Sequence, residues 1–239
     1  MKHTRINKKI LMLGCVLALG ACQTSGSTVT TPQDRAAKID SAMQRAALSS
    51  NRSGGKSLSA AERAYKRNSE SEQAAIDYAA ALRRNDFLNR ASLVLEPFAT
   101  DKDASSGAKT EFAAIMLAKG DYKLGEKYAQ QAVLKNDNNA SAYHYLGVAL
   151  DAQSMHEEAE RAFRKALDLW EGDPTSIMNN LALNLASQGH LDEAAEILQK
   201  ARDISPNKRE IERNLRIVTA LQQSDRIPVA KPKKKPDNS

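Results

Sequence analysis

The sequence predicts an all-α fold: an α-solenoid of stacked helical hairpins that ends in a capping helix. Its composition favours helix over strand, because only 11 Gly and 7 Pro occur in 239 residues. Small residues and turns recur with a period near 34 residues, which indicates one repeated unit. Beyond the last unit, residues 208–223 carry an apolar stripe opposite a charged face. A helix with one apolar face is what the open end of a solenoid needs.

Residues 1–21 have the features of a secretory signal peptide. A basic stretch precedes the apolar run from Ile10 to Leu19, which is shorter than the roughly 20 residues that span a bilayer. The tetrapeptide Leu19-Gly20-Ala21-Cys22 then resembles the lipobox of bacterial lipoprotein precursors. The resemblance implies cleavage after Ala21 and lipid attachment at Cys22. The alternatives are an ordinary secretory signal with an accidental cysteine, or a short membrane anchor.

Removal of this signal would change the charge and the thiol content of the chain. Four positive charges lie in the first nine residues, so the formal net charge of +6 would fall to +2. Nucleic acid is therefore not an expected partner. Cys15 would leave with the signal and Cys22 would carry lipid, so no disulfide is expected. Gln23 follows Cys22 where an Asp would favour inner-membrane retention, which points to an outer-membrane lipoprotein facing the periplasm.

The segments that flank the repeats differ from them in composition. Residues 22–33 are rich in Ser and Thr and are expected to form a flexible tether. Residues 34–70 form an N-terminal helical region, with a helical pattern from Asp34 and a shorter helix from Leu58 to about Arg67. Residues 207–224 form the capping helix, and residues 225–239, rich in Pro and Lys, form a disordered basic tail.

The repeated unit occupies residues 71–206. Its hairpin turns align 35, 34 and 35 residues apart, at Asn85, Gly120, Ser154 and Gly189. Small residues at equivalent places let the paired helices approach: Ala79, Ala113, Gly147 and Ala182. This pattern resembles the tetratricopeptide repeat (TPR), which implies about four helix hairpins. The first repeat is irregular, because Pro97 falls late in its second helix.

The TPR resemblance also implies a protein-binding groove. In such arrays the first helix of each hairpin lines the inner face, and its second, fifth, ninth and twelfth places point inwards. Here that lining would be neutral and semi-apolar, with Asn amides able to pair with a peptide backbone. The assigned groove residues are Thr110, Leu117, His144, Val148, Asp151, Asn179, Asn180 and Leu183. The alternative is that the apolar members are hairpin core and the Asn residues fill a helix surface.

Motifs for catalysis, metal binding or phosphate binding are not recognised in the sequence. We therefore expect no catalytic residues, no metal and no cofactor. The histidines are too dispersed for a ligand set, and His156 and His190 are expected as exposed turn residues. Ser53 and Ser106 each begin an SxxK pattern, but the partner motifs of serine acyl-enzymes are missing. A serine hydrolase that uses Ser53 or Ser106 is kept as a remote alternative.

Within the class of lipid-anchored TPR proteins, the chain resembles the TadD-type lipoproteins of Flp (tight-adherence) pilus assembly. The resemblance rests on residues 145–151, 179–183 and 213–215 together with the lipobox. It implies a non-enzymatic scaffold that binds a protein partner, such as the outer-membrane secretin. The lipid on Cys22 would anchor this scaffold to the membrane. The alternative within this class is an envelope adaptor for outer-membrane protein assembly or for peptidoglycan enzymes.

Overall fold

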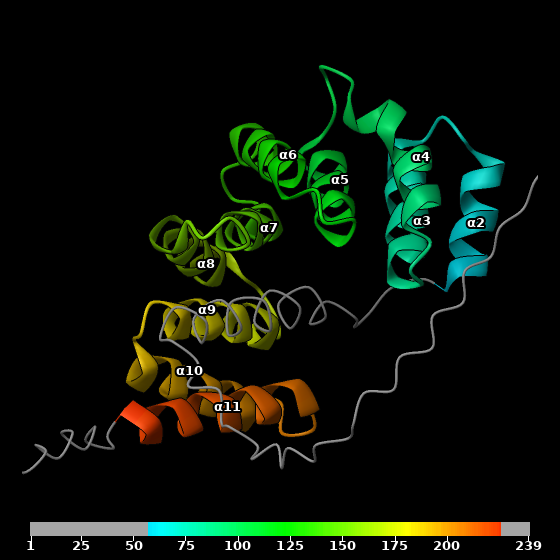
Figure 1. The fold of residues 1–239 in the computed structure, drawn as a ribbon. Helices are drawn as coiled ribbons and strands as arrows, with labels where there is room; N and C mark the ends of the chain where they lie inside the picture. The colour runs from blue at the N-terminus through cyan, green and yellow to red at the C-terminus, as the bar shows by residue number, and fades with distance from the viewer. Residues whose placement is uncertain (1–56, 226–239) are drawn as a thin grey trace, which may run out of the picture.

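The computed structural model describes residues 57–225, and throughout that range the regular elements are helices (Figure 1). The signal peptide, Cys22, the tether, the helical pattern from Asp34 and the basic tail lie outside the described residues. The helices are α2 (Leu58–Arg67), α3 (Glu72–Arg84), α4 (Leu88–Ala99), α5 (Ser106–Ala118), α6 (Tyr122–Lys135), α7 (Ala140–Asp151), α8 (His156–Leu169), α9 (Thr175–Ser187), α10 (Leu191–Ile204) and α11 (Arg209–Asp225).

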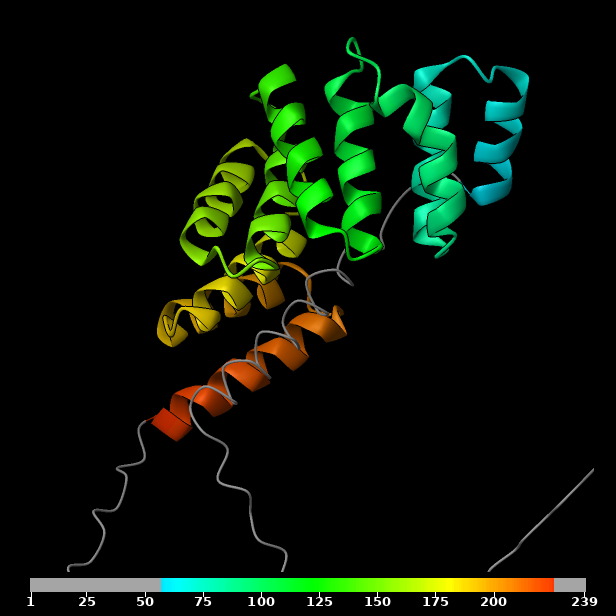
Figure 2. The ribbon, with the colours of Figure 1, turned by 45° about the horizontal axis from the view of Figure 1, so that its top comes forward.

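The helices pair into antiparallel hairpins that stack in chain order. The pairs are α3/α4, α5/α6, α7/α8 and α9/α10, with α2 packed on α3. Figures 1 and 2 show the stack turning progressively, so that α11 closes the end formed by α9 and α10. The predicted all-α solenoid with a C-terminal capping helix is therefore confirmed. Among residues 57–225, no helix combines the length and apolarity needed to cross a membrane.

Each hairpin turn contains one residue with left-handed backbone, and these residues set the true period. They are Asp86, Gly120, Ser154 and Gly189, with φ of 64°, 84°, 63° and 86°. In every turn the following amide donates to a carbonyl near the end of the first helix, as from Phe87 to Leu82. The sequence alignment places the first turn at Asn85, which is wrong by one residue. The corrected turns are 34, 34 and 35 residues apart.

The helices of each hairpin approach closely at small buried residues. Ala79, Ala113 and Ala182 are completely buried, as the pattern of small residues predicts. At the equivalent place in α7, a Cβ on Gly147 would lie 2.6 Å from the ring of Phe163. Because Phe163 is itself fully buried, only glycine leaves room for this ring.

Gly125 has a similar explanation, in a place where the next two repeats carry Ala159 and Ala194. A Cβ on Gly125 would lie 2.6 Å from Leu117, the buried residue near the end of α5. The residue equivalent to Leu117 in the last repeat is Ala186. A large residue on one helix is thus matched by a smaller one on its partner.

Candidate functional site

The eight residues assigned to the groove lie on the inner helices α5, α7 and α9, but the structure buries all of them. Each of these residues is at most 7% exposed, so the predicted lining is not open to solvent in this structure. Leu117, Val148 and Leu183 belong to one hydrophobic core cluster. The physical reason is that each inner helix is packed against helices of its own and of adjacent repeats. The eight buried residues are Thr110, Leu117, His144, Val148, Asp151, Asn179, Asn180 and Leu183.

Three polar members of this set, together with Asn214 of α11, form a chain of hydrogen bonds across the repeats, here called the amide ladder. Asn214 of α11 donates its amide Nδ2 to Asn179 Oδ1 at 2.7 Å. Asn179 donates a longer bond of 3.4 Å to Asn180 Oδ1. Asn180 in turn donates to the Nε2 of His144 at 2.8 Å. The amide ladder therefore joins α11, α9 and α7 through groups that are all inaccessible to solvent.

His144 ends the amide ladder as a neutral imidazole. Burial, and next the positive charge of Arg83, lower its pKa from 6.5 to about 4. Because the amide of Asn180 donates, His144 Nε2 accepts and the ring proton resides on Nδ1. The ring also stacks on Tyr145, with centroids 5.3 Å apart. His144 is thus held as a structural acceptor.

Asp151 anchors a second cluster, between α7, α8 and α9. Its Oδ1 lies 2.8 Å from His156 Nδ1 and accepts a 2.7 Å bond from Asn184. Asn184 also donates to the backbone carbonyl of His156 at 3.0 Å. The expectation that His156 is an exposed turn residue is therefore wrong, since its side chain is 21% exposed and pairs with Asp151. His190, by contrast, is exposed as expected.

A buried ion pair joins the first two hairpins. Arg83 of α3 donates to both carboxylate oxygens of Glu111 on α5, at 2.7 and 3.0 Å. Burial works against the charged guanidinium, yet Tyr145 and Glu111 outweigh it and raise the pKa of Arg83. Both side chains are nearly buried, at 13% and 11% exposed. Removal of one partner would leave a buried charge uncompensated.

Thr110 and Ser106 take part in a third set of bonds, at the junction of α5 with α7. Asn139, which caps α7, donates to Ser106 Oγ at 2.7 Å and to Thr110 Oγ1 at 3.0 Å. Ser106 Oγ donates to the carbonyl of Ala132 at 2.8 Å. Lys109, the Lys of the SxxK pattern, bonds to other groups instead. Among residues 57–225, the hydrogen-bond partners of Ser106 Oγ are thus a carbonyl and an amide, and Ser53 lies outside that range.

Sequence reasoning missed five members of these clusters: Arg83, Glu111, Asn139, Asn184 and Asn214. The repeat period could have found Asn214, because Thr110, His144, Asn179 and Asn214 occupy equivalent places 34, 35 and 35 residues apart. A polar residue at one place in four units indicates contacts between units. Among the described residues, no three His, Cys, Asp or Glu side chains come together as a metal site would require.

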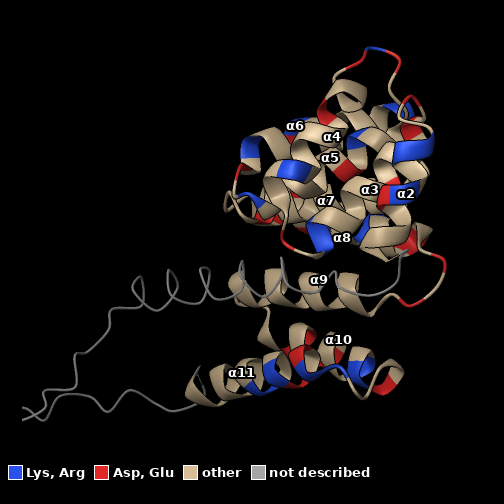
Figure 3. Cartoon of the chain, turned by 90° about the vertical axis from the view of Figure 1, so that its right-hand side faces the viewer, with Lys and Arg blue, Asp and Glu red and all other residues tan. Residues whose placement is uncertain are grey.

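The charges of the described chain lie mainly on the other helices. Figure 3 shows Lys, Arg, Asp and Glu distributed over α8, α10 and α11, whereas α9 carries none. The inner helices therefore supply mostly neutral polar contacts and the outer helices supply the charged surface. What the inner arrangement can do chemically is fix the spacing and rotation of adjacent repeats.

Comparison with known proteins agrees with this architecture. Residues 138–207 match the family model described as tetratricopeptide repeat. A structure of TTC0263, a thermophilic TPR protein of Thermus thermophilus, is 20% identical with a TM-score of 0.61, and the match covers 68% of this chain and 89% of that one. No curated protein sequence matches the chain.

Two further solved structures resemble the chain less closely. YrrB, described as a TPR protein with an unusual peptide-binding site, is 19% identical with a TM-score of 0.50, over 74% of this chain and 87% of YrrB. MamA from Desulfovibrio magneticus RS-1, residues 41 to the end, is 20% identical with a TM-score of 0.51, over 73% of this chain and 97% of that one. At such identities the likeness concerns the fold. Residues 138–207 therefore match tetratricopeptide repeats, and the described chain as a whole has the fold of a TPR-like α-solenoid.

Proposed function

We propose that the protein is a non-enzymatic, lipid-anchored scaffold that binds a protein partner during assembly of a Flp-type pilus. The observation that carries the scaffold function is the TPR solenoid itself, a fold built to present an extended surface. The lipobox ending at Cys22 supports attachment to the outer membrane on its periplasmic side. The resemblance of residues 145–151, 179–183 and 213–215 to TadD-type lipoproteins supports the pilus role, with the secretin as partner.

The amide ladder restricts where such a partner binds. Its side chains are bonded to one another and buried, so a substitution there acts first on the stacking of repeats. We infer that the partner contacts the surface of the solenoid outside the amide ladder. Binding and folding then depend on different residues and can be separated by mutation.

The test is made in a bacterium that assembles the pilus with this protein. Deletion of the gene is expected to reduce secretin multimers in the outer membrane, and Cys22→Ser is expected to abolish acyl labelling and shift the protein away from that membrane. A circular dichroism spectrum equal to that of the parent protein controls for folding. Normal secretin multimers in the deletion strain would refute the pilus role, and persistent palmitate incorporation in Cys22→Ser would refute the lipid anchor.

If secretin assembly is unaffected, co-purification of the lipidated protein distinguishes the remaining candidates. Recovery of components for outer-membrane protein assembly, or of peptidoglycan enzymes, would support the envelope adaptor instead. A serine-reactive probe that modifies Ser53 or Ser106 stoichiometrically would contradict a scaffold without catalysis.

A further inference from the structure

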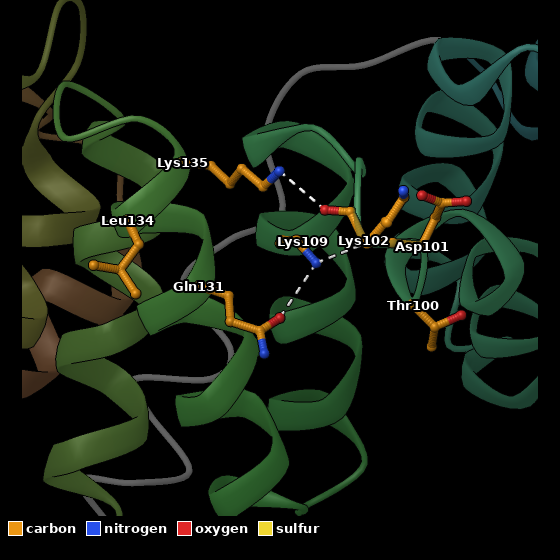
Figure 4. A pocket seen from close by; sticks show the side chains of 7 residues that line it. All are labelled: Thr100, Asp101, Lys102, Lys109, Gln131, Leu134 and Lys135. Atoms are coloured by element: carbon orange, nitrogen blue, oxygen red, sulfur yellow. Dashed lines mark hydrogen bonds between the residues drawn. The ribbon is translucent and has the colours of Figure 1, made fainter.

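A pocket opens between the first two complete hairpins, away from the amide ladder. It lies where the loop after α4 meets α5 and the end of α6, and its volume is about 380 Å³ (Figure 4). Lys109 of α5 and Lys135 of α6 both direct their ammonium groups towards the loop. Gln131 and Leu134 of α6 form the adjacent wall. A space of this size accommodates one or two side chains of a ligand.

The buried side of the pocket departs from the pattern of the other repeats. Lys109 occupies the place that Tyr143 and Met178 occupy in the next two units. Those two residues pack against the hydrophobic core, as this position in the solenoid demands. Lys109 is only 6% exposed, so a cation has replaced an apolar side chain at an interior position. Burial of a charge opposes folding unless hydrogen bonds compensate for it, so apolar packing alone does not explain a lysine at this position.

The exposed side of the pocket also departs from the pattern of the other repeats, because an apolar residue replaces a charged one there and a lysine replaces an apolar one. Leu134 and Lys135 stand where the next repeat has Asp168 and Leu169. The last repeat has the same order of acid followed by apolar residue, Asp203 and Ile204. The side chain of Leu134 is thus presented to solvent, with the residue 86% exposed. All three departures, at positions 109, 134 and 135, line the same pocket.

The positive charge at this place has no counter-charge in direct contact. Lys109 Nζ donates to the carbonyls of Ala99 at 3.1 Å and Asp101 at 3.5 Å and to Gln131 Oε1 at 3.2 Å. Lys135 Nζ donates to the carbonyl of Lys102 at 3.0 Å. Between residues 57 and 225, no carboxylate pairs with either ammonium. Burial, and next the charge of Lys135, lower the pKa of Lys109, while the more distant carboxylates of Asp101 and Glu72 act in the opposite direction without reversing the shift.

The carbonyl contacts explain how Lys109 is held, but they do not explain the other two departures. An ammonium that merely tied the loop to α6 would need neither an exposed Leu134 nor a second lysine at position 135. The bond to Asp101 is long and therefore weak, so an incoming carboxylate can take its place. Within the described structure, Lys135 donates only one of its three N–H groups to the loop.

We propose that this pocket binds an acidic peptide segment of the protein partner, with a carboxylate between Lys109 and Lys135 and an adjacent apolar side chain against Leu134. The inference rests on the proposed scaffold function and adds the chemistry of the ligand. It does not depend on the pilus assignment. Charge complementarity selects an acidic ligand, and the apolar contact selects a peptide over a simple anion.

The experiment is an isothermal titration of the purified protein with a capped pentapeptide that alternates glutamate and leucine. The matched peptide carries glutamine in place of glutamate, and inorganic phosphate and phosphatidylglycerol vesicles form two further arms. Three variants restore the residues of neighbouring repeats: Lys109→Met, Leu134→Asp and Lys135→Leu. Lys200→Met removes an exposed lysine from α10 and is the control.

The parent protein is expected to bind the acidic peptide at low salt and the glutamine peptide at least 10-fold more weakly. Lys135→Leu and Leu134→Asp are each expected to weaken binding about 10-fold or more, while Lys200→Met binds like the parent. Lys135→Leu and Leu134→Asp both change exposed positions, so the helicity of these two variants should equal that of the parent. They therefore test the proposal even if Lys109→Met folds poorly. Equal binding by Lys135→Leu, Leu134→Asp and the parent would overturn the proposal. Binding of phosphate or vesicles without binding of the peptide would overturn it as well.

Discussion

Gly147→Ala adds a single methyl group where α7 crosses α8. The new Cβ would lie 2.6 Å from two atoms of the Phe163 ring, far inside van der Waals contact. Phe163 is completely buried and close to the ring of His144, with centroids 6.1 Å apart, so the ring has little space for retreat. We therefore expect the two helices to be forced apart at this crossing.

The magnitude follows from two opposing effects. Overpacking of a buried site costs about 1–3 kcal/mol, and this contact falls at the upper end because two ring atoms clash. Replacement of glycine by alanine inside a helix returns about 1 kcal/mol through helix propensity. The expected net loss in the free energy of unfolding is therefore about 2 kcal/mol.

The next repeat supplies the matched compensation. Its equivalents of Gly147 and Phe163 are Ala182 and Leu198, and both are buried. In a Phe163→Leu background the clash disappears while the helix propensity remains, so Gly147→Ala should stabilise that background by about 1 kcal/mol. The effect of Gly147→Ala on stability is thus expected to change sign according to whether residue 163 is Phe or Leu.

The assay is equilibrium urea unfolding of the parent, the two single variants and the double variant, followed by circular dichroism. Gly120→Ala serves as a control, because a Cβ there meets nothing within 4 Å and its cost comes from the backbone φ of +84°. Phe163→Leu should leave that cost unchanged. A Gly147→Ala protein as stable as the parent, or an equal loss in both backgrounds, would refute the argument from ring contact.

Three further predictions concern the buried polar groups. His144→Gln should flatten the acid dependence of stability. In the parent protein the folded pKa of His144, about 4, lies below its ordinary value of 6.5, so the contribution of the neutral ring to stability is complete above pH 6.5. The free energy of unfolding of the parent should then fall by about 3 kcal/mol as the pH drops to 4. Urea unfolding between pH 4 and 7 measures this, and an unchanged slope would contradict it. Arg83→Met should cost about 3–5 kcal/mol by leaving Glu111 buried and unpaired, and a second substitution Glu111→Leu should recover much of that loss. Thermal unfolding of both proteins tests the pair, and a double variant no more stable than Arg83→Met would argue against it. Asn214→Ala should cost about 1–3 kcal/mol by removing a donor to the amide ladder. Faster amide hydrogen exchange in α11 would report this loss, whereas unchanged protection would show that the bond does not hold the helix.

Secondary structure and the order of the hairpins follow from local sequence alone. Helix α2 begins and ends where the local pattern places it, at Leu58 and Arg67. Apolar periodicity and capping residues act over only a few neighbouring residues, and the same local pattern recurs in each repeat. The period also identifies the small residues at helix crossings, because a close approach excludes larger side chains whatever surrounds it.

The accessible face of each inner helix depends instead on how neighbouring repeats pack. Its place in the repeat assigns Asn179 to an open groove, yet this residue is completely buried and bonded to Asn214, 35 residues further along. Asp151 likewise acquires His156 and Asn184 as partners only when adjacent helices pack. Periodicity defines a direction around one helix, whereas burial depends on what the neighbouring helices place there. For the same reason, the pocket at Lys109 exists only because α6 brings Leu134 and Lys135 beside it.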